Sequence, residues 1–223
     1  MRYLIVIAHP DDEAFGCGAT IFKLAQQGHE VAVATLCAKA AARAVLSDTL
    51  NDDQAEAHRI LGVQRAYNAD FPNIKMNTVP HLDMVQFIER CILDFGAEAI
   101  MTHHPADTNI DHRETSGAAQ AAFRLFQRRA GVPEIRQVMF MEIVASTEWS
   151  IDSSSRQFVP NFFFEIGKDG FEKKVEALKA YRNVIRPYPH PSSLEVIQAQ
   201  ALLRGSQAKC NYAEAYQMVF QRT

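Results

Sequence analysis

The segment Tyr3-Leu-Ile-Val-Ile-Ala-His-Pro-Asp-Asp-Glu13 near the amino terminus carries the clearest fold signal in the chain. Its first six residues are apolar without alternation, which is typical of a strand buried on both faces, as in a parallel sheet. Residues 13–27 then repeat apolar side chains at helical spacing, and Gly28 follows them as a C-terminal glycine would. The segment therefore predicts a buried strand that leads directly into a helix.

The alternation of strands and helices continues to about residue 146. Further strands are expected at 31–36, 65–69, 97–102 and 138–144, with helices at 52–61, after Pro80 and from His112. Parallel strands joined by helices need right-handed crossovers, so we predict an α/β fold with a Rossmann-like, doubly wound, mainly parallel sheet.

Residues 147–223 change the pattern. A polar loop is followed by an aromatic strand at 162–166, an amphipathic helix at 171–185, a Pro-rich turn and a last helix toward Arg204. Because no repeat, Gly/Ser linker or charge block separates this part, we expect a single domain over 1–223. Residues 1–146 would form its core and 147–223 an appended C-terminal lobe.

Composition excludes several classes of protein. The 223 residues are 48% hydrophobic with a net charge of −3, and no basic run is longer than Arg128-Arg129, so a nucleic-acid partner is not expected. The apolar run at 3–8 is far shorter than a membrane span of roughly 20 residues. The four cysteines lie far apart without a C-x-x-C pair, which argues against disulfides or a sulfur-rich zinc site. We expect a cytoplasmic protein with reduced cysteines and no membrane partner.

Polar side chains crowd the ends of two predicted strands. In an open α/β sheet, ligands bind in the crevice outside the carboxyl ends of the strands. Imidazoles and carboxylates gather there from two segments: His9, Asp11 and Asp12 after the first strand, and His104, Asp111 and His112 after the fourth. Two such loops at neighbouring strand ends favour a metal site.

His9, Asp12 and His112 would supply the three protein ligands that a catalytic Zn²⁺ takes, with one position left to water. His9 and Asp12 are three residues apart across a strand-to-helix turn, so both can face the crevice. Asp11 stays uncoordinated and could take the proton from water whose pKa the ion lowers to about 7. As an alternative, Asp11, Asp12 or Asp111 could simply cap the helix that follows.

These motifs resemble the LmbE/PIG-L family of zinc-dependent N-deacetylases. The resemblance is strongest in three amino-terminal and central motifs: Ala8-His-Pro-Asp-Asp-Glu13, Gly16-x-Gly18 and Asn109-Ile-Asp-His112. Segments of many bacterial members are similar to three later ones: Tyr188-Pro-His-Pro191, Arg204-Gly205 and Tyr212-Ala-Glu-Ala215.

The resemblance implies hydrolysis of an acetamido group, usually on a glucosamine-type sugar that is free, nucleotide-linked or lipid-linked. It implies one Zn²⁺ per chain on His9, Asp12 and His112, with Asp11 as general base. It also places His190 near the metal, where it would stabilise the oxyanion, although an exposed imidazole in a Pro-rich turn is the alternative. Some relatives draw this histidine from a neighbouring subunit, so a homo-oligomer is expected.

One position departs from the family pattern. Many relatives carry a histidine where this chain has Asn109, and an amide can donate a hydrogen bond but cannot transfer a proton at neutral pH. The leaving amine must therefore be protonated by Asp11 or His190. We favour Asp11 as base and then acid, with His190 and the metal holding the oxyanion.

Other polar residues have weaker signals. Glu142 interrupts an apolar strand and is expected in a buried structural pair. The remaining candidates for substrate contact lie near the two loops or after the second strand: Arg43, His104, Asn109 and Arg113. Packing is the alternative for His104, and a solvated position at a helix start is the alternative for Arg113.

Three other functions compete. A dinucleotide site is suggested by Gly16-x-Gly18, but the third glycine would fall at Ile21 and no acidic residue ends the second strand. Two histidines and a carboxylate also form the facial triad of a non-haem iron oxygenase. A non-catalytic sugar-binding protein is suggested by Asn109, but binding alone does not need a free carboxylate such as Asp11. Hydrolysis of an N-acetyl amino sugar is the predicted function.

Overall fold

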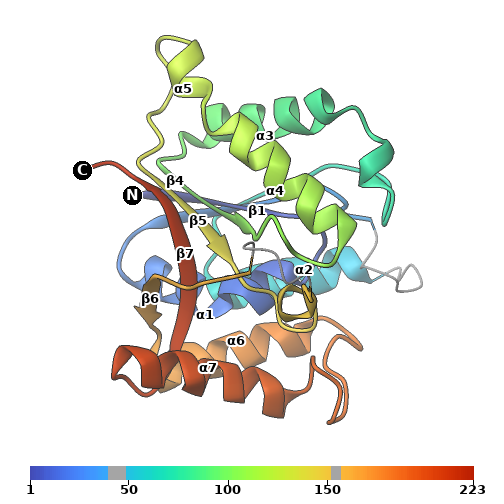
Figure 1. Ribbon diagram of the computed structural model, residues 1–223, viewed down its shortest axis with the longest axis vertical. Coiled ribbons are helices and arrows are strands. Elements are labelled where there is room, and N and C mark those ends of the chain that lie inside the picture. The colour runs from blue at the N-terminus through green and yellow to red at the C-terminus, as the bar shows by residue number, and fades with distance from the viewer. Residues whose placement is uncertain (40–48, 152–156) are drawn as a thin grey trace.

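A computed structural model describes residues 1–39, 49–151 and 157–223 of the chain. Within these ranges seven strands form one sheet in the order β3-β2-β1-β4-β5-β7-β6 (Figure 1). The strands are β1 (Arg2–Ile7), β2 (Glu30–Thr35), β3 (Arg65–Asn68), β4 (Ala99–His103), β5 (Gln137–Met141), β6 (Phe162–Glu165) and β7 (Ala213–Gln221).

The sheet is mainly parallel, as predicted. β1 pairs in parallel with β2 and β4, β2 with β3, and β4 with β5. β7 runs antiparallel to β5, and β6 antiparallel to β7. Because β1 lies between β2 and β4, the strand order reverses beside β1, and this switch point is where open α/β sheets bind ligands.

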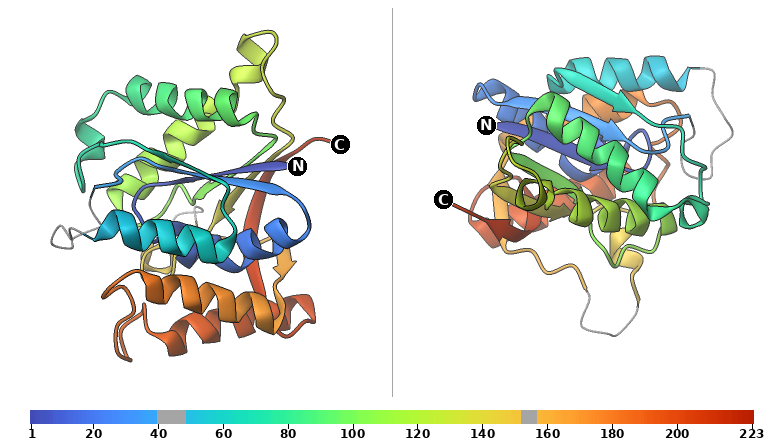
Figure 2. Two further views of the ribbon diagram at one scale, coloured as in Figure 1. Left: turned by 180° about the vertical axis from the view of Figure 1, so that it is seen from behind. Right: turned by 90° about the horizontal axis from the view of Figure 1, so that it is seen from above.

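Helices cover both faces of the sheet (Figures 1 and 2). They are α1 (Asp12–Gln26), α2 (Leu50–Leu61), α3 (His81–Phe95), α4 (Ile110–Ala122), α5 (Leu125–Arg128), α6 (Gly167–Ala180) and α7 (Leu194–Ala208), with the short 3₁₀ helices η1 (Met76–Thr78) and η2 (Thr147–Trp149). None of the helices described is both long and apolar enough to cross a membrane.

The packing of β1 on both of its faces explains why its sequence does not alternate between apolar and polar residues. Ile5 and Ile7 pack into the core that contains residues of α1, α2 and α6, whereas Leu4 and Val6 pack into the core under α3 and α4. Both faces of the strand are therefore shielded from solvent. Each Å² of apolar surface buried on either side stabilises the fold by roughly 25 cal/mol. The doubly wound α/β prediction is confirmed.

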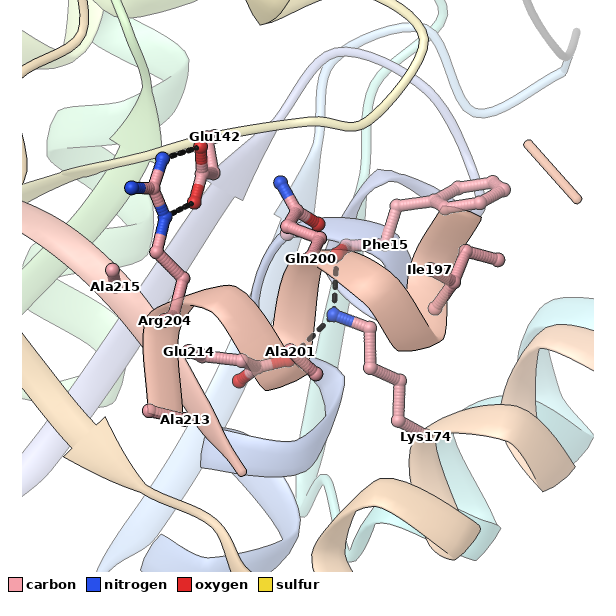
Figure 3. Close-up of a pocket in the computed structure, with 11 residues that line it drawn as sticks. Phe15, Glu142, Lys174, Ile197, Gln200, Ala201, Arg204, Ala213, Glu214 and Ala215 are labelled. Carbon is pink, nitrogen blue, oxygen red and sulfur yellow. Dashed lines mark hydrogen bonds and ion pairs between the residues drawn. The ribbon is translucent and has the colours of Figure 1, made fainter. Parts of the chain in front are cut away.

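The carboxyl-terminal part extends the core sheet with β6 and β7. The aromatic strand was predicted, but β7 was not, and α6 ends at Ala180 rather than continuing to 185. Glu142 forms the expected structural pair: its two carboxylate oxygens accept hydrogen bonds from the Arg204 guanidinium at 2.6 and 2.7 Å (Figure 3).

A buried ion pair between Lys174 and Glu214 of this part also contacts the backbone of α1. The helix is interrupted at Cys17, and the free N–H groups of Ala19 and Thr20 donate to the Glu214 carboxylate of β7 at 3.2 and 2.7 Å. Lys174 of α6 donates to Glu214 and to the Phe15 carbonyl, both at 2.6 Å (Figure 3). The backbone groups that the kink in α1 leaves without helical partners thus bond to side chains more than 150 residues later in the sequence.

Candidate active site

The three predicted metal ligands meet at the switch point of the sheet. His9 follows β1, Asp12 begins α1, and His112 lies in the first turn of α4. One ligand atom from each lies within 4.8 Å of the others, and all three side chains are buried. Residues about 100 positions apart are therefore brought together because β1 and β4 are neighbours.

His9 is oriented by a carboxylate. Its Nε2 lies 3.0 Å from Asp111 Oδ2, and Asp111 also accepts hydrogen bonds from the N–H groups of Ile74 and Met76 at 2.6 and 3.0 Å. Asp111 does not cap α4, because Asn109 does so by accepting the Asp111 N–H at 2.9 Å. The opposite nitrogen of His9, Nδ1, is buried without a hydrogen-bond partner.

His112 is oriented in the same way by a residue that the sequence analysis missed. Its Nδ1 lies 3.2 Å from Asp107 Oδ1, and Asp107 also accepts hydrogen bonds from the hydroxyls of Ser146 and Thr147. The other nitrogen, Nε2, is buried without a hydrogen-bond partner and lies 3.3 Å from Asp12 Oδ1. A carboxylate behind an imidazole is a common signal of a metal-binding histidine.

The charges of the site reinforce one another. Burial opposes protonation of the imidazoles, but the neighbouring carboxylates outweigh it and raise the pKa of His9 to about 9 and that of His112 to about 10. Burial would raise the pKa of Asp107, but hydrogen bonds from His112, Ser146 and Thr147 hold it at about 2. Burial would also raise the pKa of Asp12, but the nearby His112 holds it well below its usual range.

This arrangement fits a divalent metal ion. Two buried imidazole nitrogens without partners and a buried carboxylate converge on one point, and each imidazole is fixed from behind by a second carboxylate. Two nitrogens and one carboxylate oxygen are a ligand set that catalytic zinc sites use, with room left for water or substrate. The residues present therefore match the metal dependence that the sequence motifs imply.

Asp11 lies between two of these residues in an unusual backbone conformation. Its φ of 100° is in the left-handed region, and its side chain makes no capping hydrogen bond to α1. The capping alternative is therefore not seen for Asp11. Burial, and then the charges of Asp12 and Glu13, raise the pKa of Asp11 well above that of an ordinary carboxyl group.

His103, which the sequence analysis left without a role, lies against the site. Its ring stacks on His112 with centroids 4.0 Å apart, and its Nε2 accepts the Ala8 N–H at 2.9 Å. Burial, and then the nearby His112, lower the pKa of His103. The neutral ring therefore fixes the backbone just before His9 and supports the plane of His112.

The polar residues predicted to contact substrate have protein partners. His104 uses both ring nitrogens, because Nδ1 accepts the Ala106 N–H and Nε2 lies 3.1 Å from Gln217 Oε1. Arg113 donates from Nη1 to two carbonyls of the preceding loop at 2.8 and 2.9 Å. The contacts of His104 favour its packing alternative, and those of Arg113 hold the loop before α4. The Asn109 cap occupies only the side-chain oxygen.

One further predicted residue is not joined to this cluster. His190 is exposed in the segment between α6 and α7, and in the described part of the chain no hydrogen bond or ring contact links it to His9, Asp12 or His112. Its Nδ1 accepts the Ser192 N–H at 3.1 Å. Arg43 lies outside the described residues.

Comparisons with known proteins agree with these motifs. A family model described as "PIG-L: GlcNAc-PI de-N-acetylase" matches residues 4–123. Among curated proteins, the uncharacterized deacetylase YaiS of Escherichia coli K12 is 24% identical over 185 residues, which cover 81% of this chain and 90% of YaiS.

Two solved structures illustrate the shared fold. The N,N'-diacetylchitobiose deacetylase of Pyrococcus horikoshii matches 98% of this chain and 83% of its own, with a TM-score of 0.78 and 18% identity. GalB of Pseudomonas putida, a 4-carboxy-2-hydroxymuconate hydratase, matches 100% and 97%, with a TM-score of 0.80 and 22% identity. At these identities the likeness concerns the fold, which supports more than one reaction.

Proposed function

The chain belongs to the PIG-L family of de-N-acetylases, which are hydrolases of amides, and we propose that it removes the acetyl group from an N-acetyl amino sugar. The observation that carries this proposal is the convergence of His9 Nδ1, Asp12 and His112 Nε2 beside the uncoordinated carboxylate of Asp11. The deacetylase names of YaiS and of the chitobiose enzyme support an acetylated substrate. The sugar would be free, nucleotide-linked or lipid-linked.

Zn²⁺ is the proposed metal, one ion per chain, held by His9, Asp12 and His112. When bound, zinc lowers the pKa of a coordinated water to about 7 and polarises a carbonyl oxygen. Asp107 and Asp111 hold the two imidazoles so that one nitrogen of each faces the site. This fixed orientation keeps the two imidazoles aligned toward the site.

Asp11 would act twice. Its carboxylate takes the proton from the attacking water and then delivers it to the nitrogen of the leaving amine. Burial raises the pKa of Asp11, so the carboxyl group exchanges a proton more readily near neutral pH than an ordinary aspartate does. Asn109 replaces the histidine of many relatives, and its amide can donate a hydrogen bond to the substrate but not a proton.

His190 would stabilise the oxyanion of the tetrahedral intermediate. Its Nδ1 accepts the Ser192 N–H, so the neutral ring carries its proton on Nε2 and can donate from there. Because the ring is exposed in a single chain, we propose that a homo-oligomer places it at the site of its own or a neighbouring subunit. Arg43 stays a predicted substrate contact, because it follows the second strand in the sequence.

We also propose that residues 1–223 form one domain and that the protein works in the cytoplasm. Pairing of β7 with β5 supports the single domain, because the carboxyl-terminal part completes the same sheet. Widely spaced cysteines without a C-x-x-C pair are compatible with a reducing compartment.

The test is hydrolysis itself. Zinc-loaded protein is incubated with N-acetylhexosamines, their nucleotide conjugates and their lipid conjugates, and freed amine and acetate are both quantified. We expect equal amounts of the two products, loss of activity with a chelator, and no requirement for O₂ or a 2-oxo acid. Water addition to an unsaturated acid without amide hydrolysis would instead favour a hydratase, and the absence of acetate from every substrate would refute the proposal.

A further inference from the structure

A buried carboxylate that the mechanism does not use lies directly behind Asp11. Glu13 is fully buried, and one of its oxygens, Oε2, accepts the Asp11 N–H at 3.2 Å. Its other oxygen, Oε1, accepts the hydroxyl hydrogen of Tyr181 and lies 3.5 Å from His58 Nε2. Glu13 therefore bridges the backbone of the proposed base and two residues of other helices.

The hydrogen bond to Asp11 acts where the backbone needs support. A non-glycine residue in a sparsely populated backbone region costs about 1–3 kcal/mol and persists only when its surroundings hold it there. Asp11 has a φ of 100°, and its carbonyl accepts the Phe15 N–H at 3.0 Å. The Glu13 contact fixes the other side of the same residue, its amide, so the direction of the Asp11 side chain is defined.

Tyr181 keeps Glu13 in place. The phenol is buried at the end of α6, and burial and then the charge of Glu13 raise the pKa of Tyr181, so the hydroxyl stays protonated and donates. The next residue, Arg182, donates its N–H to Asp53 of α2 at 3.2 Å. The carboxyl-terminal part of the chain therefore contacts the loop that carries Asp11 through Tyr181 and Glu13.

We infer that Glu13, held by Tyr181, is a positioning residue that aims the Asp11 carboxylate at the water and the leaving amine. The inference rests on the proposed function, since it assumes that Asp11 moves the proton. Glu13 itself would touch neither substrate nor metal. A misplacement of about 1 Å in a reacting group can cost about 100-fold in rate, which is the scale of the expected effect.

The experiment compares three variants of the full chain. Glu13→Ala removes both hydrogen bonds. Tyr181→Phe removes the donor to Glu13 together with the phenol oxygen, which also interacts with the Asp11 backbone. Glu13→Gln keeps an oxygen for the Asp11 N–H and an amide for the Tyr181 oxygen. Tyr216→Phe is the matched control, because Tyr216 is also buried and its hydroxyl also contacts a buried glutamate, Glu214. Four readouts are taken: kcat, KM, zinc content and hydrogen exchange of the Asp11 amide.

We expect kcat to fall about 10- to 100-fold in Glu13→Ala and less in Tyr181→Phe, while KM and zinc content stay within about 3-fold. Glu13→Gln should recover most of kcat, and Tyr216→Phe should leave kcat unchanged. Exchange of the Asp11 amide should accelerate in Glu13→Ala and Tyr181→Phe only. Should Glu13→Ala fail to fold, Tyr181→Phe and Glu13→Gln carry the comparison.

Wild-type kcat together with slow Asp11 exchange in Glu13→Ala or Tyr181→Phe would overturn the inference, as would loss of zinc in parallel with loss of kcat. Failure of the proposed function has a different signature. In that case the wild-type protein releases no acetate from any substrate, while the exchange of the Asp11 amide still reports whether Glu13 holds this residue.

Discussion

At the level of single residues, the two histidines of the proposed metal site face it with different nitrogens. Asp111 takes Nε2 of His9 and leaves Nδ1, whereas Asp107 takes Nδ1 of His112 and leaves Nε2. The protein therefore selects the ring nitrogen through the carboxylate behind each ring. Removing one of these carboxylates should weaken metal binding without removing a ligand.

Asp107→Asn tests this orientation. The variant keeps an oxygen near His112 but loses the charge, so we expect zinc affinity to fall by about 10- to 100-fold, measured by competition with a chelating dye. Asp169→Asn on the surface of α6 is the control and should bind zinc like the wild type, because Asp169 pairs with Lys23 at the protein surface. Unchanged affinity in Asp107→Asn would argue against an orienting role.

Asp11→Asn separates proton transfer from metal binding. The side chain keeps its size but can no longer accept a proton, so kcat should fall by about 10²- to 10⁴-fold. Zinc content should stay at one ion per chain, because Asp11 is not among the converging ligands. His112→Ala is the contrasting variant and should lose the metal. A normal kcat in Asp11→Asn would remove the proposed base.

The raised pKa values of His9 and His112 predict how the metal-free protein responds to pH. The ordinary pKa of histidine is about 6.5, and the folded values are about 9 and about 10. A group whose pKa is higher in the folded state stabilises it fully below the unfolded pKa, and this stabilisation is lost as the pH rises through the folded pKa. The folded state should therefore lose stability between about pH 7 and pH 10.

Thermal unfolding of the metal-free protein at a series of pH values measures this loss. Zinc-loaded protein is the control, because its imidazoles are already deprotonated and the decline should be smaller. Zinc binding at pH 7 should also release protons, which calorimetry in buffers of different ionisation enthalpy detects. A stability of the metal-free protein that rises over this pH range would contradict the predicted charge state.

Sequence patterns predicted the three side chains that converge, but not the residues that orient them. His9, Asp12 and His112 were predicted because imidazoles and carboxylates followed two buried strands. Asp107 and Ser146 carry no signal of their own, since an aspartate or a serine in a loop is common, and only the fold brings residue 146 to residue 107. The sequence places His103 at the end of a strand, but it does not predict that the ring stacks on His112, because the spacing of residues does not determine ring orientation.

Among the elements, α7 packs closely against the turn that leads into β7, and the contact is made at Gly205 of the helix. A Cβ at this position would lie 2.7 Å from the Cys210 carbonyl oxygen and 2.8 Å from that of Asn211, and both obstacles are backbone. The Arg204-Gly205 motif noted in the sequence therefore has a steric reason. Only a residue without a side chain lets the helix approach the chain that leads into β7.

Gly205→Ala should destabilise the protein by about 1–3 kcal/mol, because the backbone must shift to relieve the overlap. Gly117→Ala in α4 is a matched control: its new Cβ would be 3.6 Å from His81, an ordinary contact, and alanine favours a helix over glycine by about 0.5–1 kcal/mol. Denaturant unfolding gives both values. Equal stability of Gly205→Ala and the wild type would show that the turn is not constrained.

The elements of the parallel core were predictable and β7 was not, for a physical reason. β1, β2 and β4 have continuous apolar runs because both of their faces are buried. β7 instead buries Glu214, which reads as a surface residue unless its partners are known. Lys174 and the kink of α1 supply those partners, and both are distant in the sequence.

At the scale of the whole molecule, the carboxyl-terminal part supports the loop that holds the proposed site. Glu214 satisfies the kink in α1, and Tyr181 reaches Glu13 beside Asp11. α1 begins at Asp12, so both contacts bear on the helix that carries this proposed metal ligand. The amino-terminal motif and the carboxyl-terminal part are therefore structurally coupled through α1.

The pairing of β1 with β4 brings the loops that follow these strands into one site, which is the basis of the proposed hydrolysis. Anomalous diffraction at the zinc edge, from crystals of the zinc-loaded protein, would locate the ion directly. We expect one peak per chain, about 2.0–2.2 Å from His9 Nδ1, an Asp12 carboxylate oxygen and His112 Nε2. A peak bound by other residues, or no peak in a preparation that releases acetate, would contradict a metal shared by these two loops.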